Sequence, residues 1–145
     1  MQEKILIIQT AFLGDAVLTL PMIQKLKEKF PDSSLNLLCI PSTKEIFEHS
    51  PFIDKVIVYD KRGEQKSFWD FIRLLIFIKG QKFTRVYCPH RSFRSSLLAL
   101  FSGAKITVGF DISSCSFLYK TRVKYFTCKH EVARNLDLIE YYTSN

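Results

Sequence analysis

One carboxylate stands out as a group that could do chemistry. Asp15 follows Gly14 at the point where the apolar run 5–8 gives way to residues with helical spacing. A carboxylate in such a position can accept a proton and act as a general base. Gly14 would let a backbone N–H come close to a ligand. The alternative is structural, because acids at the start of a helix often cap it or interact favourably with its dipole.

Two groups of cations follow other apolar runs and could hold an anionic ligand. The first is the polar stretch after residues 54–60, with Lys61, Arg62 and Lys66. A basic loop of this kind is usually only solvated surface. The second follows residues 83–89 and comprises His90, Arg91 and Arg94. Cations at the start of a helix oppose its dipole, so they need a partner there. A phosphate or carboxylate of a ligand could be that partner, and a salt bridge to an acid such as Asp111 is the alternative.

The elements that must position these groups alternate between strand and helix. Short apolar runs predict strands over 5–8, 35–40, 54–60, 83–89 and 106–110, with a further short strand over 122–126. Helical spacing predicts helices over 15–30, 42–49, 68–78, 92–102 and 131–142. The helix over 15–30 either begins near Pro21 or begins at Asp15 and bends at Pro21. In the last helix Val132, Leu136 and Ile139 form the expected buried stripe.

This alternation predicts an α/β fold with a mostly parallel sheet flanked by helices. Right-handed crossovers then bring the loops after the strands to one edge of the sheet, where such folds bind ligands. The chain of 145 residues suits a single domain. His130 starts the last helix, where a lone histidine is more often a cap than a catalyst.

Several functional classes lack their signatures. Only Gly14 stands where a dinucleotide fingerprint needs three spaced glycines, and no phosphate-loop Lys-Ser/Thr pair follows it. Cys39, Cys88, Cys115 and Cys128 have no metal-site spacing, and the first two are expected to be small buried apolar residues. The apolar stretch 68–78 is too short to span a bilayer. It could lie at a membrane surface, although a crossover helix packed on the sheet is favoured.

The formal charge of +7 is concentrated in the second part of the chain. Residues 1–60 carry a net charge of −2 and residues 61–145 carry +9. Such an excess favours anionic partners: a phosphate-bearing glycolipid, a membrane surface or nucleic acid. Nucleic acid is least favoured, because the cations do not fall on one recognition helix and no aromatic platform is evident.

Three segments carry a resemblance to a known family. The residues LGDAVLTLP (13–21) resemble the opening of the lipopolysaccharide heptosyltransferases, glycosyltransferase family 9. The residues RSFRSSLLA (91–99), with Gly103 and VGF (108–110), resemble the family's middle segment. The residues HEV (130–132), with Asn135 and Leu136, resemble its later helix. The segments keep the family's order, and the similarity runs over essentially the whole chain.

The resemblance implies a function for the candidate residues. Asp15 matches the family's proposed base, Thr10 and Gly14 would shape the acceptor pocket, and the cations would bind the anionic acceptor: Lys61, Arg62, Lys66, His90, Arg91 and Arg94. The implied reaction is inverting transfer of heptose from an ADP-sugar to the lipopolysaccharide core, lipid A with its keto-sugars. The ADP-sugar is a substrate, and no cofactor or metal is expected.

The family's enzymes have two Rossmann-like lobes in the GT-B arrangement. Residues 1–145 would form the N-terminal, acceptor-binding lobe, with the C-terminal donor-binding lobe absent from this chain. The expected location is the cytoplasm, at the inner face of the cytoplasmic membrane. The alternative is a non-catalytic truncated lobe or binding module that docks onto anionic glycolipid or a partner lobe. Reading-frame sequence beyond Asn145 would distinguish the two.

Overall fold

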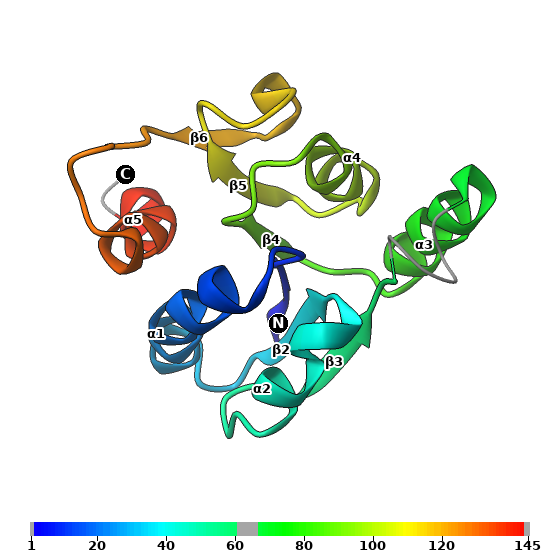
Figure 1. Ribbon diagram of the computed structural model, residues 1–145, viewed down its shortest axis with the longest axis horizontal. Helices are drawn as coiled ribbons and strands as arrows, with labels where there is room; N and C mark the ends of the chain where they lie inside the picture. The colour runs from blue at the N-terminus through cyan, green and yellow to red at the C-terminus, as the bar shows by residue number, and fades with distance from the viewer. Residues whose placement is uncertain (1, 61–66, 144–145) are drawn as a thin grey trace.

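A parallel sheet forms the centre of the molecule. The computed structural model describes residues 2–60 and 67–143, and these form six strands in the order β3-β2-β1-β4-β5-β6 (Figure 1). All five pairings are parallel. The strands are β1 (Lys4–Ile8), β2 (Ser34–Cys39), β3 (Lys55–Val58), β4 (Arg85–Cys88), β5 (Ile106–Phe110) and β6 (Thr121–Val123). The predicted α/β class and the Rossmann-like arrangement are confirmed.

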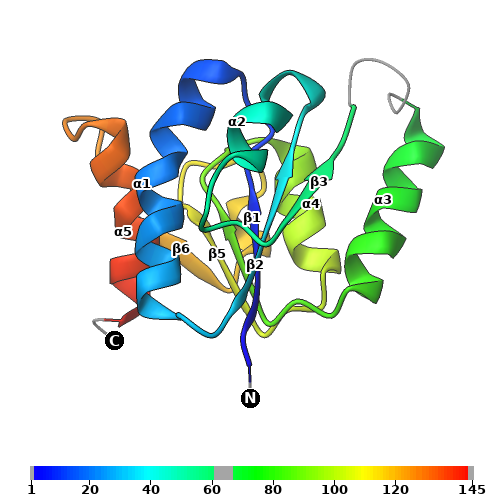
Figure 2. The ribbon, with the colours of Figure 1, turned by 90° about the horizontal axis from the view of Figure 1, so that it is seen from below.

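Helices cover both faces of the sheet (Figures 1 and 2). One face packs against α1 (Leu13–Lys29), α2 (Lys44–Glu48) and α5 (Glu131–Thr143), and the other against α3 (Phe68–Gly80) and α4 (Phe93–Phe101). Two short 3₁₀ turns complete the described elements, η1 (Pro41–Thr43) and η2 (Ser116–Leu118). No helix in the described ranges is long and apolar enough to cross a bilayer.

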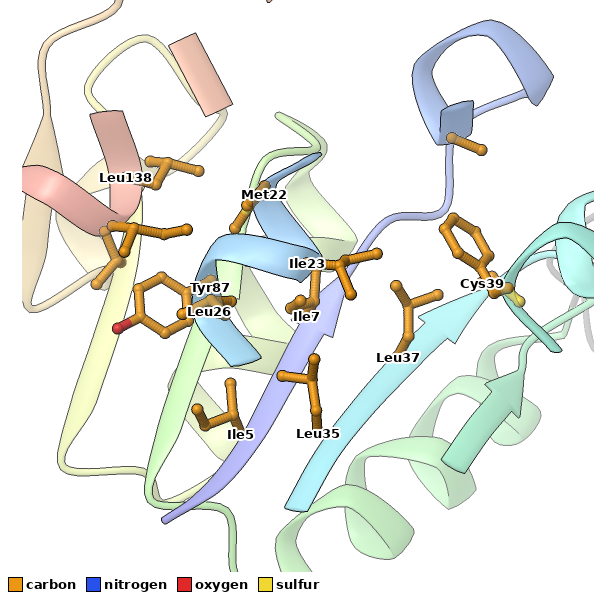
Figure 3. Close-up of a cluster of buried hydrophobic side chains, with 14 of the residues drawn as sticks. Ile5, Ile7, Met22, Ile23, Leu26, Leu35, Leu37, Cys39, Tyr87 and Leu138 are labelled. Carbon is orange, nitrogen blue, oxygen red and sulfur yellow. The ribbon is translucent and has the colours of Figure 1, made fainter. Parts of the chain in front are cut away.

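The alternation of side chains along β1 divides the core into two halves. Ile5 and Ile7 point to the face of α1, where they meet Met22 and Leu26 (Figure 3). The intervening residues of β1 pack in the second cluster, beneath α3 and α4. Ile5 to Ile8 are fully buried, which is why the run is continuously apolar rather than alternating.

Helix α1 begins earlier than its apolar spacing predicts. Phe12 is the N-cap and Leu13 the first helical residue, so Gly14 lies inside the first turn and does not interrupt the pattern. The helix also continues through Pro21, so the predicted start near Pro21 is wrong. Pro21 has no N–H to donate to the carbonyl of Val17, which lies on the exposed side where water can satisfy it.

Two predictions near the C-terminus need correction. The short strand forms at Thr121–Val123 rather than over 122–126, because pairing with β5 sets its register. Among residues 131–140 of α5 the buried ones are Asn135, Leu138 and Ile139. Of the predicted stripe, Ile139 is confirmed, whereas Val132 and Leu136 are only partly buried. The cause is the packing of α5 on α1, where the Asn135 side-chain amide donates to the Leu18 carbonyl at 3.2 Å.

The buried cysteines behave as expected from the sequence. Cys39 and Cys88 are free thiols and fully buried. Burial raises the pKa of both thiols to about 11. Both therefore remain protonated and unreactive at neutral pH.

Candidate active site

The polar groups gather where the strand order reverses, between β1 and β4. In doubly wound folds the crevice outside the carboxyl ends of these two strands is the usual ligand site. Thr10 follows β1 and His90 follows β4, and Thr10 Oγ1 lies 2.9 Å from His90 Nδ1. Ser95 Oγ is 3.4 Å from the same ring nitrogen. These contacts join the two strand ends directly.

A buried hydrogen-bond chain fixes the turn between β1 and α1. The Gln9 side-chain amide donates to Thr19 Oγ1 at 2.8 Å, and the Thr19 hydroxyl donates to the backbone carbonyl of Asp15 at 2.8 Å. Gln9 Oε1 also accepts from the backbone N–H of Ala11. Gln9 and Thr19 are both buried, so their bonds form away from competing water. The backbone that carries Asp15 is therefore held from inside the molecule.

Asp15 lies in the first turn of α1, third from its start, and is half-buried. The N-cap position belongs to Phe12, with no side-chain cap bond, so the capping role considered for Asp15 is not observed. The carboxylate still lies at the positive end of the helix dipole. A Cβ added at Gly14 would have nothing within 4 Å. Gly14 therefore faces open space.

A second carboxyl group, from the start of α5, lies against Asp15. Burial raises the pKa of Glu131, and the charge of Asp15 and a hydrogen bond between the two carboxyl groups raise it further. The charges of Arg134 and Arg91 act in the opposite direction. Glu131 therefore holds its proton to a higher pH than an ordinary glutamate, and the protonated form can donate to Asp15.

Two arginines and a tyrosine border this carboxyl pair. The guanidinium groups of Arg91 and Arg134 lie 4.7 and 4.6 Å from the centre of the Tyr125 ring. Tyr125 itself packs edge-on against Phe110 at 5.2 Å between ring centres. Stacking on the ring positions both cations without neutralising them, so they can still attract an anion.

A pocket of about 430 Å³ opens at the same edge of the sheet, where the strands end, on the side away from the Asp15–Glu131 pair. Within it the Arg94 Nη1 donates to the Tyr59 hydroxyl at 2.9 Å, and the guanidinium lies 5.7 Å from the centre of the Phe71 ring. The lining residues are Thr10, Tyr59, Ser92, Phe93, Arg94, Ser95 and Leu98. Thr10 thus lines the pocket while it also bonds to His90.

The structure places most of the residues singled out from the sequence along this edge. Asp15, Thr10, His90, Arg91 and Arg94 lie on the first turn of α1, after β1 and around the start of α4. Lys61, Arg62 and Lys66 lie outside the described residues.

The structure also decides between the alternatives for three groups. In the described part of the chain no salt bridge joins Arg91 or Arg94 to an acid, so the proposed pairing with Asp111 is wrong. Asp111 instead accepts from the backbone N–H of Tyr125 at 3.2 Å. His130 Nδ1 accepts from the backbone N–H of Val132 at 3.2 Å, which confirms its reading as a cap.

Three site residues were missed from the sequence: Tyr59, Glu131 and Arg134. Glu131 and Arg134 are three apart at the start of a predicted helix, so they share a face, and this was the available signal. The sequence gives no sign that Glu131 contacts Asp15, which is more than a hundred residues away. Tyr59 reads as an ordinary strand residue, and only the fold brings its hydroxyl to Arg94.

Several known proteins are similar to this chain in sequence or in fold. No protein-family model matches the chain. A putative glycosyltransferase of Haemophilus influenzae is 31% identical over 140 residues, which are 94% of this chain and 40% of the relative. The crystal structure of a family 9 glycosyl transferase from Veillonella parvula matches with a TM-score of 0.82 and 26% identity, over 97% of this chain and 42% of that one. The E. coli heptosyltransferase WaaC, solved with ADP, matches with a TM-score of 0.80 over 95% of this chain and 46% of its own; at 17% identity this likeness concerns the fold.

The strand order and the polar switch point define a Rossmann-like ligand-binding domain. The sequence match and the match to the Veillonella structure narrow this class. The chain is similar to the Haemophilus glycosyltransferase in sequence and to the Veillonella family 9 glycosyl transferase in fold. It spans less than half the length of the relatives that it matches.

Proposed function

We propose that this chain is the N-terminal, acceptor-binding lobe of a family 9 glycosyltransferase that transfers heptose from ADP-heptose to the lipopolysaccharide core. The observation that carries the proposal is the position of Asp15. It is held at a fixed helix start beside the open space at Gly14, with Arg91 and Arg134 next to its partner Glu131. The heptose and the lipopolysaccharide acceptor enter from relatives, among them an ADP-heptose lipopolysaccharide heptosyltransferase II from E. coli with the same fold.

In the proposed reaction Asp15 accepts the proton of the acceptor hydroxyl. The hydroxyl oxygen then forms a bond to the anomeric carbon, while the bond from that carbon to the phosphate oxygen breaks and ADP leaves with the electron pair. Attack opposite the leaving group inverts the configuration at this carbon. Glu131, with its raised pKa, can donate a hydrogen bond to Asp15 and so orient the carboxylate toward the acceptor.

The cations of the edge suit an acidic acceptor. Arg91 stacks on an aromatic ring, Arg134 stacks on the same ring and donates to the Phe126 and Lys129 carbonyls, and Arg94 donates to a hydroxyl. None of the three forms a salt bridge within the described residues. Their charges are therefore available for the carboxylates and phosphates of keto-sugars and lipid A. Thr10 and His90, bonded to each other, would contact sugar hydroxyls from the floor of the crevice.

The donor is assigned to the other lobe of a complete enzyme. The described β1–α1 turn has one glycine and no lysine, so it lacks the elements of a phosphate-binding loop. We accordingly expect little affinity of this chain for ADP or ADP-heptose in calorimetry, and micromolar binding would contradict the division of roles. The proposed location is the inner face of the cytoplasmic membrane, where the acceptor is built.

The test joins this chain to the remaining part of the Haemophilus relative and measures transfer from ADP-heptose. Asp15→Asn keeps the size of the side chain but cannot accept the proton. Turnover should fall by about 10² to 10⁴-fold, the usual contribution of a general base. The melting temperature should stay the same, because the Asp15 side chain does not cap α1.

Asp32→Asn is the matched control. Asp32 is an exposed acid in the turn between α1 and β2, at the end of the sheet where the strands begin. Its substitution should leave turnover unchanged. If Asp15→Asn lowered stability and kept its turnover per folded molecule, Asp15 would be a structural residue. The chain would then be better described as a binding module for anionic glycolipid.

A further inference from the structure

Helix α3 exposes large apolar side chains on the side away from the core. Its buried stripe consists of Phe71, Leu74 and Ile78, which pack with the sheet and near α4. On the opposite side Phe68, Trp69 and Ile76 are 68%, 71% and 67% exposed. An isolated exposed residue needs no explanation, but three such residues on one short helix form a patch.

The position of α3 leaves this patch uncovered by the described residues. In Figures 1 and 2 α3 lies at one end of the molecule, beyond β3 and α4, with no labelled element on its outer side. β3 is the edge strand of the sheet, so no further strand extends the structure under the helix. α3 is therefore apolar on both of its sides and uses only one of them for folding.

Basic side chains border the patch. Arg73 and Lys79 are exposed on α3, and Lys82 is exposed just after it. Lys55 on β3 places its Nζ 5.6 Å from the centre of the Phe77 ring. Asp70 is the one acid on α3, and it is bound by Ser67 Oγ and by Arg73 Nη1 at 3.5 Å. Long cationic side chains around an apolar surface can reach negative charge while their stems stay against apolar groups.

We propose that the outer face of α3 docks onto the surface of a bilayer that contains anionic lipids. Phe68, Trp69 and Ile76 would enter the interface between headgroups and acyl chains, where tryptophan is favoured, and the cations would contact lipid phosphates. A helix of 13 residues is about 20 Å long, shorter than the roughly 30 Å hydrocarbon core, so it lies in the plane of the surface and does not span it.

Charge decides between a membrane and a second copy of the chain as the occupant. Two copies of this face would place Arg73 and Lys79 of both chains at one contact surface, and like charges repel there. An anionic bilayer instead neutralises them. This inference rests on α3 and its cations and goes beyond the proposed transfer reaction. Because α3 begins at the same edge of the sheet as the candidate site, docking would bring that edge near the lipid surface (Figure 2).

Trp69 is the single tryptophan of the chain, so its fluorescence reports on this face alone. The experiment adds vesicles of phosphatidylcholine with phosphatidylglycerol, or of phosphatidylcholine alone, to the intact chain. With the anionic vesicles the Trp69 emission should shift to shorter wavelength and become protected from acrylamide. Higher salt should weaken the binding, because the electrostatic part is screened.

Two sets of variants locate the contact. Phe68→Ser with Ile76→Ser keeps Trp69 as the reporter and should weaken vesicle binding at least about tenfold, since each side chain loses its burial in the interface. Lys79→Gln with Lys82→Gln should weaken binding to anionic vesicles by about fivefold for each cation. The matched control is Ile112→Ser with Phe117→Ser, which removes the same two residue types at comparable exposure elsewhere and should bind like the wild type.

Three results would overturn the proposal. The first is an unchanged Trp69 emission with anionic vesicles. The second is equal vesicle binding by the wild type and the Phe68/Ile76 variant, with both melting at the same temperature. The third is protection of Trp69 without lipid that increases with protein concentration, together with a dimer in sedimentation, because a second copy would then occupy this face.

Discussion

Helices α1 and α3 both pack on the sheet, but they are held very differently. α1 packs on the sheet beside α5, and Ala16, Thr19, Met22, Ile23 and Leu26 are buried along its length. α3 lies at the end of the molecule, packs on one side and exposes Phe68, Trp69 and Ile76 on the other. The helix that carries Asp15 is therefore packed along a second helix as well as on the sheet, whereas α3 keeps an apolar outer face that no described residue covers.

The difference shows which part of the lobe can hold a precise geometry and which can meet a partner. A catalytic carboxylate needs its backbone fixed, and the Gln9–Thr19–Asp15 chain together with α5 fixes it. A docking surface instead needs apolar area that folding has not used. The two tasks fall on different helices because α1 packs against both the sheet and α5, whereas α3 at the end of the molecule keeps an exposed apolar face.

The comparison of α1 with α3 predicts its largest effect on the free energy of unfolding. Leu26→Ala on α1 removes a fully buried side chain and should cost about 2 to 5 kcal/mol of the free energy of unfolding. Ile76→Ala on the outer face of α3 should change it by less than about 0.5 kcal/mol, because an exposed side chain leaves no cavity. Urea unfolding of both variants measures the contrast. Equal losses would mean that α3 is covered in the folded chain.

A smaller effect is expected on acceptor binding, where substitutions distinguish the two sides of the candidate site. Arg91 lies near the Asp15–Glu131 pair, whereas Arg94 lies in the pocket toward α3 and bonds to Tyr59. Arg91→Gln should weaken binding of a phosphorylated lipid A and keto-sugar acceptor by about tenfold, the loss of one charge-assisted hydrogen bond. Binding should also become less dependent on salt.

Arg94→Gln is the matched comparison for this measurement. If it weakened acceptor binding more than Arg91→Gln does, the acceptor would occupy the pocket lined by Tyr59 and Arg94 rather than the side of α1. If neither substitution changed binding, both arginines would belong to the solvated surface. Surface plasmon resonance at two salt concentrations distinguishes these results.

The smallest effect concerns the contact between α1 and α5. The pKa of Glu131 is raised, so the folded chain holds this proton to higher pH than the unfolded chain. Stability should therefore fall as the pH rises from the ordinary glutamate value, 4.5, through the raised value in the folded state. Glu131→Gln should remove this dependence and be more stable above the window by less than about 1 kcal/mol. Melting temperatures of both proteins between pH 4 and pH 8 test the sign.

Individual elements show how far sequence reasoning reached. The apolar run of β1 predicted a strand correctly, because it reflects burial on both faces of the sheet. The spacing of α1 predicted a helix correctly, because it reflects burial on one face of the helix. The start of α1 was placed two residues late, at Asp15 instead of Leu13, because apolar spacing does not mark a first turn that contains Gly14. The stripe of α5 was shifted because a helix with mixed polarity offers several faces, and contact with α1 selects one.

The sequence by itself determined the α/β class, the edge of the sheet on which the polar loops meet, and Asp15 as a candidate base. The first two follow from local periodicity and from the fixed hand of crossovers, which depend on near neighbours in the chain. The third rests on the place of Asp15 at a strand-to-helix turn together with the resemblance of residues 13–21 to the family's opening segment. Only the tertiary structure decided that Glu131 contacts Asp15, that Thr10 bonds to His90, and that α3 keeps an uncovered apolar face. Each of these depends on packing between segments distant in sequence, for which the amino-acid pattern has no local signal.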